Sequence, residues 1–209
     1  MESLRVNATA RSRVAIVGGS AIALMGASAE AHLSSSGMGP IYDGLMHFLM
    51  SPEDLVPALA LGLFAGLRGP AHSRRVLFVL PSMWLLGSLV GLHAAAISGS
   101  AITSVSAIWF LLIGGLVVAD AKLSIGLITA LAGAVGLYHG YLNGTGMGAS
   151  VTAAVTVFGL VSSVFVLVAL AAAFAVQLQQ HRARIAIRVV GSWVAASGML
   201  LLGWTIRGG

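Results

Sequence analysis

Long apolar segments, separated by short polar ones, run along almost the whole chain. Each apolar segment is close to the ~20 residues that an α-helix needs to cross the hydrocarbon core of a bilayer. Backbone groups in lipid must form hydrogen bonds within their own segment, so we expect each segment to be a helix. The pattern predicts six such helices, at residues 43–67, 76–97, 101–119, 123–142, 151–176 and 185–206.

The N-terminal apolar stretch, VAIVGGSAIALMGASA, has features of a different kind of segment. Three arginines precede it and small residues end it, which is typical of a secretory signal peptide with a small-x-small cleavage site. We predict a signal peptide over residues 1–31 and one all-α domain over 32–209, a bundle of six transmembrane helices. The alternative is that residues 1–31 remain as an uncleaved additional helix.

The composition agrees with a membrane protein. Of the 209 residues, 58% are hydrophobic and 8% are charged, whereas about 25% are charged in soluble domains. If the processed N-terminus lies outside, seven basic residues fall in inner loops and only Arg207 falls outside, as the positive-inside rule requires. The seven inner residues are Arg68, Arg74, Arg75, Lys122, Arg182, Arg184 and Arg188.

This distribution has consequences for partners and location. The formal net charge of +5 is explained by topology, so we expect no nucleic-acid partner. We expect a multi-pass protein of the bacterial inner (cytoplasmic) membrane, surrounded by the lipid bilayer, with its mature N-terminus outside. The chain has no cysteine, which excludes disulfides, thiolate metal ligands and cysteine nucleophiles.

Histidines gather on the predicted outer side. His72 and His181 fall in inner loops beside arginines, where solvated residues are the simplest interpretation. The other four, on the outer side, are His32, His47, His93 and His139. A single histidine in a helix is more often a hydrogen-bonded structural residue than a ligand, but ionisable groups in membrane segments are costly and usually functional.

The first predicted helix carries a polar stripe. At ~100° per residue, four of its side chains fall within about 60° of one another, namely Asp43, His47, Met50 and Asp54. Asp43 and His47 are spaced i, i+4, so one divalent cation could contact both. Imidazole suits nickel, copper and zinc, whereas thioether selects copper(I).

The sequence SPED allows another interpretation of this region. Ser51 would be an N-cap, Pro52 the first helical residue, and Asp54 the acid of a capping box. The helix would then begin at Ser51, and residues 43–50 would form a short separate helix or a re-entrant segment. The continuous stripe would be broken, as in the discontinuous helices of transporters.

Two short motifs resemble those of the HupE/UreJ family of hydrogenase/urease accessory permeases. The family's first motif is approximately H-P-x-x-G-L-D-H, and GLMH at 44–47 matches its end, with His47 on the last histidine and Asp43 able to reach the place of the aspartate. Its later motif is approximately H-G-x-A-H-G-x-E. HGYLNGTG at 139–146 matches it with His139 kept, Asn143 in place of the second histidine and Gly146 in place of the glutamate.

The resemblance implies uptake of nickel or cobalt through a six-helix permease, and the methionines add copper as a candidate. The metal would be the transported substrate, not a permanently bound cofactor, and the chain would not be an enzyme. A second copy of the chain or a metalloenzyme-maturation protein are the protein partners that we expect. The alternative is a non-transporting membrane subunit whose polar residues hold helices together or dock a partner enzyme. The candidate metal ligands are Asp43, His47 and His139, followed by His32, His93 and Asn143.

Overall fold

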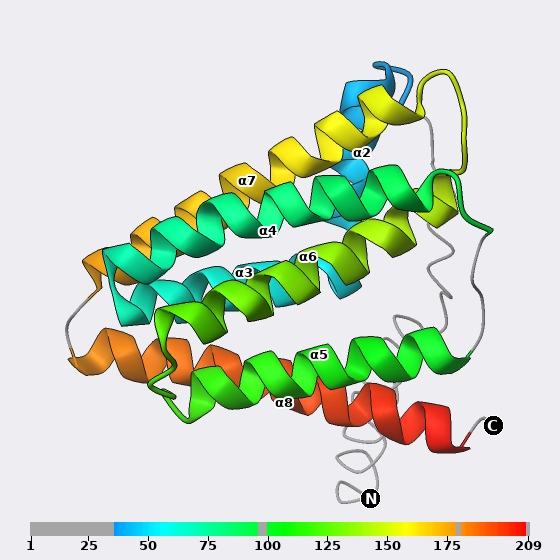
Figure 1. Ribbon diagram of the computed structural model, residues 1–209. Helices are drawn as coiled ribbons and strands as arrows, with labels where there is room; N and C mark the ends of the chain where they lie inside the picture. The colour runs from blue at the N-terminus through cyan, green and yellow to red at the C-terminus, as the bar shows by residue number, and fades with distance from the viewer. Residues whose placement is uncertain (1–35, 96–99, 179–180, 208–209) are drawn as a thin grey trace, which may run out of the picture. The chain divides into compact units, whose positions relative to one another are not determined.

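The structure is a computed structural model that describes residues 36–95, 100–178 and 181–207. The predicted signal peptide and His32 lie outside the described residues. All regular structure in the described part is α-helical, as predicted (Figure 1). The helices are α2 (Pro40–Met50), α3 (Pro52–Arg68), α4 (Pro70–Gly91), α5 (Ser100–Val118), α6 (Ile125–Met147), α7 (Ala153–Gln177) and α8 (His181–Arg207).

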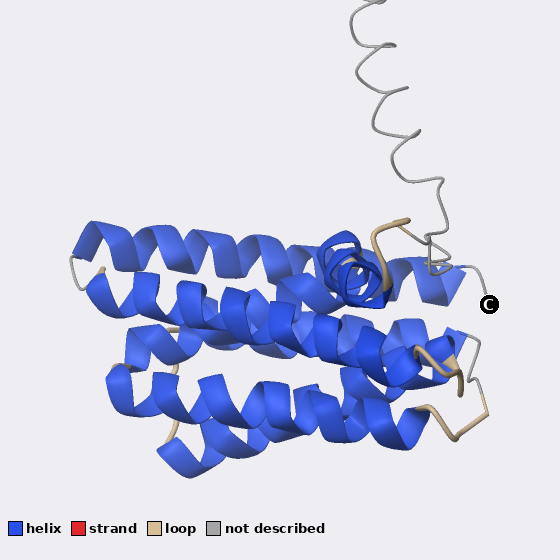
Figure 2. Cartoon of the chain, turned by 90° about the horizontal axis from the view of Figure 1, so that it is seen from above, coloured by secondary structure: helices blue, strands red, loops and turns tan. Residues whose placement is uncertain are grey.

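The first predicted helix is broken at Ser51. Helices α2 and α3 meet there at an angle of 76°, and Figure 2 shows α2 nearly end-on while the other helices run across the view. Pro52 lacks an N–H and disfavours the helical conformation of the residue before it, so Ser51 is extended at φ −101° and ψ 90°. A continuous helix over 43–67 is therefore wrong, and a helix starting at Ser51–Pro52 is confirmed.

The predicted N-cap is not made by the side chain of Ser51. Its hydroxyl instead donates a 2.7 Å hydrogen bond back to the carbonyl of His47. The backbone carbonyl of Ser51 accepts from the N–H groups of Asp54 and Leu55, so the serine joins the end of α2 to the first turn of α3. The bend is thus stabilised from both of its sides.

Several of these helices are long and apolar enough to cross a membrane. Four of the described segments meet both conditions: α4, α6, α7 and residues 184–207 of α8. The bent pair α2–α3 adds a fifth if it is one span, and α5 is apolar but shorter over Ile102–Val118. The chain is therefore a multi-pass membrane protein.

Close packing of α4 against α6 depends on small residues. A Cβ atom at Gly136 would lie 2.5 Å from the carbonyl oxygen of Leu80 on α4. At Gly140 a Cβ would collide with the backbone of Trp84. Glycine at these positions lets the two backbones approach each other, and this approach brings the neighbouring residue His139 against Trp84.

Helix α3 lies among the other helices, in contact with α4, α5, α6, α7 and α8. Its side chains Leu61 and Phe64 are fully buried. Helix α5 lies beside α8, and α4 lies beside both α6 and α7 (Figure 1). Because α3 begins at the break, its first turn carries Asp54 into the packed interior between the helices.

Candidate functional site

Asp54 is the centre of a buried polar cluster. It lies in the first turn of α3, and only 3% of it is exposed. Its Oδ1 lies 2.8 Å from Nδ1 of His139, and its Oδ2 accepts a 2.8 Å hydrogen bond from Nδ2 of Asn143. The i, i+4 spacing places both partners on the same face of α6, so one carboxylate contacts both.

The carboxylate determines the proton arrangement of the imidazole. An ionised aspartate can only accept hydrogen bonds, so the ring of His139 carries its proton on Nδ1 and donates it to Asp54. In the neutral ring Nε2 then has a free lone pair. His139 is 1% exposed, and its Nε2 is buried without a hydrogen-bond partner among the described residues.

A buried polar atom with no partner is costly and needs an explanation. A histidine that donates one N–H to a carboxylate and presents its other nitrogen is the arrangement found at many metal sites, where the carboxylate fixes the ring and raises its basicity. The pair Asp54–His139 therefore has the geometry of one metal ligand together with the group that orients it.

Trp84 of α4 completes the cluster from another helix. Its indole Nε1–H donates a 3.2 Å hydrogen bond to Oδ1 of Asn143. Its ring stacks on His139 with centroids 5.3 Å apart and planes at 26°, while Tyr138 meets the imidazole edge-on at 5.1 Å. Phe48 packs edge-on against Trp84 at 5.7 Å. The imidazole ring is thus fixed in orientation on several sides.

The predicted ligands lie in different places. His139 and Asn143 are brought together, through Asp54. His47 is half-buried in the last turn of α2, within electrostatic range of Asp54, with no side-chain hydrogen bond in the described part. Asp43 accepts a 2.5 Å hydrogen bond from the backbone N–H of Ser36.

His93, the remaining predicted ligand that the structure describes, is exposed beyond the end of α4. Its Nδ1 lies 3.2 Å from the carbonyl oxygen of Leu89, in the last turns of the same helix. Among the residues with described positions, no three His, Asp or Glu side chains lie close enough together to hold a metal ion. The described cluster therefore presents one free nitrogen donor, not a complete coordination shell.

Sequence reasoning placed Asp54 in the polar stripe or in a helix cap but not in the site. The sequence does not single out Trp84 as part of a site. One signal could have identified Asp54: it is one of only six acids in the chain, and it lies within an apolar segment where an acid is expensive. No comparable sequence signal distinguishes Trp84 from the other tryptophans.

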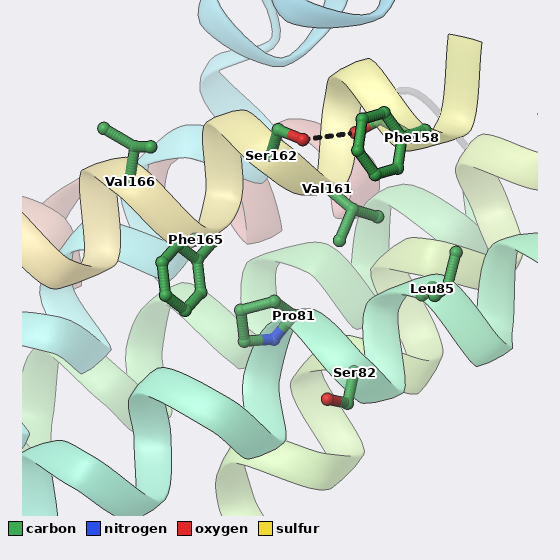
Figure 3. A pocket seen from close by; sticks show the side chains of 8 residues that line it. All are labelled: Pro81, Ser82, Leu85, Phe158, Val161, Ser162, Phe165 and Val166. Atoms are coloured by element: carbon green, nitrogen blue, oxygen red, sulfur yellow. Dashed lines mark hydrogen bonds between the residues drawn. The ribbon is translucent and has the colours of Figure 1, made fainter. Parts of the chain in front are cut away.

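A separate cavity of about 400 Å³ lies between α4 and α7 (Figure 3). Its walls include Pro81, Leu85 and Phe165, and no titratable side chain lines it. The hydroxyl of Ser162 points to the carbonyl of Phe158 on its own helix, to which it donates a 2.8 Å hydrogen bond. This cavity thus offers no ligand for a metal ion.

Comparison with known proteins agrees with the motifs and the fold. No curated protein and no solved structure matches the chain significantly. The family described as HupE / UreJ protein matches residues 20–201, which is most of the chain. That family consists of membrane proteins linked to nickel or cobalt uptake or to accessory roles, and it is not a known family of enzymes. The chain belongs to the HupE/UreJ family.

Proposed function

We propose that this protein is a permease that takes up nickel or cobalt ions, with Nε2 of His139 as a ligand on the path of the ion. One observation carries the proposal: Asp54 contacts Nδ1 of His139, and the other ring nitrogen, Nε2, is buried with no described partner. In the neutral ring that hydrogen-bonds to an ionised Asp54 through Nδ1–H, this nitrogen has a free lone pair. Imidazole nitrogen is a ligand that suits borderline divalent metals. Buried ionisable groups in membrane segments commonly mark ion pathways.

A second register of the first family motif supports the same cluster. If His47 is aligned with the first histidine of H-P-x-x-G-L-D-H, Glu53 falls on the aspartate and Asp54 on the last histidine. The proline, glycine and leucine of the motif are replaced by Phe48, Ser51 and Pro52, so the correspondence rests on residue type at three positions. In this register Asp54, the last residue of the first motif, contacts His139 and Asn143 of the second. The two motifs then meet in space, whereas the register ending at His47 leaves Asp54 outside the motif.

The neighbouring donors favour a nickel or cobalt substrate over copper(I). His47 lies on the other side of the break, and Glu53 is an exposed carboxylate within electrostatic range of His139. Nitrogen and oxygen donors suit borderline divalent ions, whereas soft sulfur donors such as thioethers select copper(I). Met50 is 71% exposed, so its sulfur does not contribute to the buried cluster.

Movement at the break would complete the site. Helices α2 and α3 are connected by one extended residue, Ser51, and a change in their 76° angle would change the distance between His47 and His139. Broken helices with ion sites at the break are a recurring design in secondary transporters. We propose that α2 approaches α6 when the ion binds, with His47 as the second nitrogen donor.

The proposal also includes six membrane crossings, with the pair α2–α3 and the shorter α5 each counted as one. Seven of the basic residues lie at the end of the bundle where α3 ends and α4, α6 and α8 begin (Figure 1). This end would face the cytoplasm. A reporter inserted at 148–150 should then be accessible from outside, and the opposite result would place the α6–α7 loop inside.

Uptake into proteoliposomes tests the proposal. Vesicles containing the full chain should accumulate nickel or cobalt, and His139→Ala should abolish most of the accumulation because the free nitrogen is gone. His93→Ala is the matched control, since that histidine is exposed and outside the cluster. Equal uptake by wild type and His139→Ala, at equal protein content, would overturn the proposal.

One observation favours the alternative of a non-transporting subunit. Both carboxylate oxygens of Asp54 and both polar atoms of the Asn143 amide are already hydrogen-bonded within the protein. Such a cluster could serve only to join α3, α4 and α6. In that case Asp54→Asn would lower the melting temperature of the chain, and wild-type vesicles would accumulate no metal.

A further inference from the structure

The arginines at the end of the bundle where α4 begins fall into two groups. Arg68 and Arg184 both form ion pairs with Asp120, and Nε of Arg188 donates a 2.7 Å hydrogen bond to the carbonyl of Val118. Arg74 and Arg75 are exposed and have no ion pair or hydrogen bond from their side chains among the described residues. Their positive charges are therefore available to a ligand.

These two unpaired arginines line a cavity of about 450 Å³. The rest of its lining is apolar and comes from α4 and the start of α6: Ala71, Phe78, Val79 and Ile125. No carboxylate lines it. A guanidinium group binds phosphate oxygens in a two-pronged arrangement, so the polar side of the cavity has the chemistry of a phosphate site.

The order of the lining along α4 gives the cavity a direction. Phe78 and Val79 follow the two arginines by four residues, which corresponds to a rise of about 6 Å along the helix. The arginines thus lie nearer the end of the bundle, and the apolar residues lie deeper along a helix that can span the membrane. A phospholipid has the same order, with its phosphate at the interface and its acyl chains below.

We propose that Arg74, Arg75 and the apolar residues beside them bind the headgroup and upper acyl chain of an anionic phospholipid. A free phosphate ion would leave the exposed apolar surface of Phe78 and Ile125 uncovered, whereas a lipid covers it. A zwitterionic headgroup would bring a cationic amine towards two guanidinium groups with no carboxylate in the lining to receive it. Basic cavities between transmembrane helices are known sites for anionic lipids.

The lipid site is separate from the proposed metal path, since none of its lining residues belongs to the cluster around Asp54. Lipid binding can therefore be tested without any metal. The measurement is the dissociation constant of phosphatidylglycerol for the purified full chain in detergent, obtained by native mass spectrometry. Phosphatidylcholine with the same acyl chains is the comparison lipid.

We expect wild type to bind phosphatidylglycerol in preference to phosphatidylcholine. The double variant Arg74→Gln/Arg75→Gln should raise the dissociation constant of phosphatidylglycerol roughly 30-fold. Arg182→Gln is the matched control, because this exposed arginine lies at the same end of the bundle but does not line the cavity. Its affinity should stay within about twofold of wild type. A loss as large as in the double variant would indicate general surface charge and overturn the proposal.

Two further measurements need only the wild-type chain, so they hold even if a variant folds poorly. Equal affinity for phosphatidylglycerol and phosphatidylcholine would overturn the anionic preference. Inorganic phosphate in large excess should not displace the bound lipid, because phosphate cannot cover the apolar wall of the cavity. Displacement by phosphate would identify a site for a free anion and overturn the proposal that the cavity binds a lipid.

Discussion

Asp54 at the start of α3 and His139 near the end of α6 are 85 residues apart in sequence, yet their side chains meet at 2.8 Å in the buried interior. The contact depends on two features that the sequence encodes separately. Pro52 starts a new helix and places Asp54 in its first turn. The glycines of α6 allow it to approach α4, so that His139 lies against Trp84. The arrangement links the break in the first span to the second motif.

The direction of the hydrogen bonds makes Asp54→Asn an informative change. Trp84 donates to Oδ1 of Asn143, so the amide nitrogen of Asn143 must donate to residue 54. An asparagine at 54 would accept that bond with its oxygen and turn its own NH₂ towards Nδ1 of His139. The imidazole proton would then move to Nε2, and the free lone pair would be lost.

We therefore expect Asp54→Asn to abolish metal uptake while the protein still folds. The tautomer can be read directly from the ¹⁵N shifts of the histidine ring in the purified protein. A ring that keeps its proton on Nδ1 in this variant would contradict the hydrogen-bond directions assigned to the cluster.

Trp84→Phe should release the amide of Asn143. Removing the indole donor costs one hydrogen bond, about 1 kcal/mol, and we expect a several-fold loss of metal affinity because Asn143 loses one of the two partners that hold its amide. In the double variant Asp54→Asn/Trp84→Phe, Asn143 is free to turn its amide. Its oxygen would then accept a hydrogen bond from the NH₂ of the asparagine at 54, and the oxygen of that asparagine could again accept from Nδ1–H of His139. We expect the double variant to bind metal better than Asp54→Asn alone. Additive losses in a double-mutant cycle would argue against this coupling.

Gly136→Ala tests whether the approach of α4 and α6 positions the cluster. A Cβ at this position would lie 2.5 Å from the carbonyl oxygen of Leu80, so the helices must separate. We expect a loss of about 1–3 kcal/mol in unfolding free energy, together with weaker metal uptake. Gly146→Ala on the same helix is the control, since no atom lies within 4 Å of its added Cβ. A melting temperature equal to that of the control would show that α4 and α6 tolerate separation.

Asp120 joins three elements at the basic end of the bundle. It lies between α5 and α6 at φ 48°, in the left-handed region, and pairs with Arg68 of α3 and Arg184 of α8. Asp120→Asn keeps a residue that tolerates this backbone conformation but removes the charge between two arginines. We expect a lower melting temperature, corresponding to about 1–3 kcal/mol, because the side chain of Arg68 is largely buried and would lose its counter-charge.

Arg74→Gln is the matched comparison for this ion-pair cluster, because the side chain of Arg74 has no described partner in the protein. Its melting temperature should stay within about 1 °C of wild type. Equal melting temperatures for Asp120→Asn and wild type would show that the two ion pairs contribute nothing measurable, as is common for exposed pairs.

The helices could be predicted from the sequence because each has a long apolar segment bounded by glycine, proline or charged residues. The start at Pro52 was one of two readings of SPED, and the sequence alone could not choose between them because an apolar helix can also pass through a proline. Pro57 and Pro81 do lie inside helices. The local pattern around Ser51 is therefore compatible with both outcomes.

The site was predictable only in part. The i, i+4 spacing placed His139 and Asn143 on one face of a helix, and the structure has them there. Their partner could not be identified, because Asp54 is 85 residues from His139 and meets it only through the packing of α3 against α6. Asp54 was grouped with Asp43 and His47 on the assumption of one straight helix, and the 76° bend removes it from that stripe. Asp43 and His47 keep their i, i+4 spacing within α2.

The central claim is that Nε2 of His139 binds the transported ion. Its most direct test is a titration of the purified full chain with nickel and cobalt, by calorimetry, on wild type, His139→Ala and the control His93→Ala. We predict that wild type and the control bind the metal ions, and that His139→Ala lowers the affinity on the order of 100-fold. This loss is at least as large as the losses of affinity caused by changes to the outer shell of metal sites. Unchanged nickel and cobalt affinity in His139→Ala, with the protein folded, would contradict the claim.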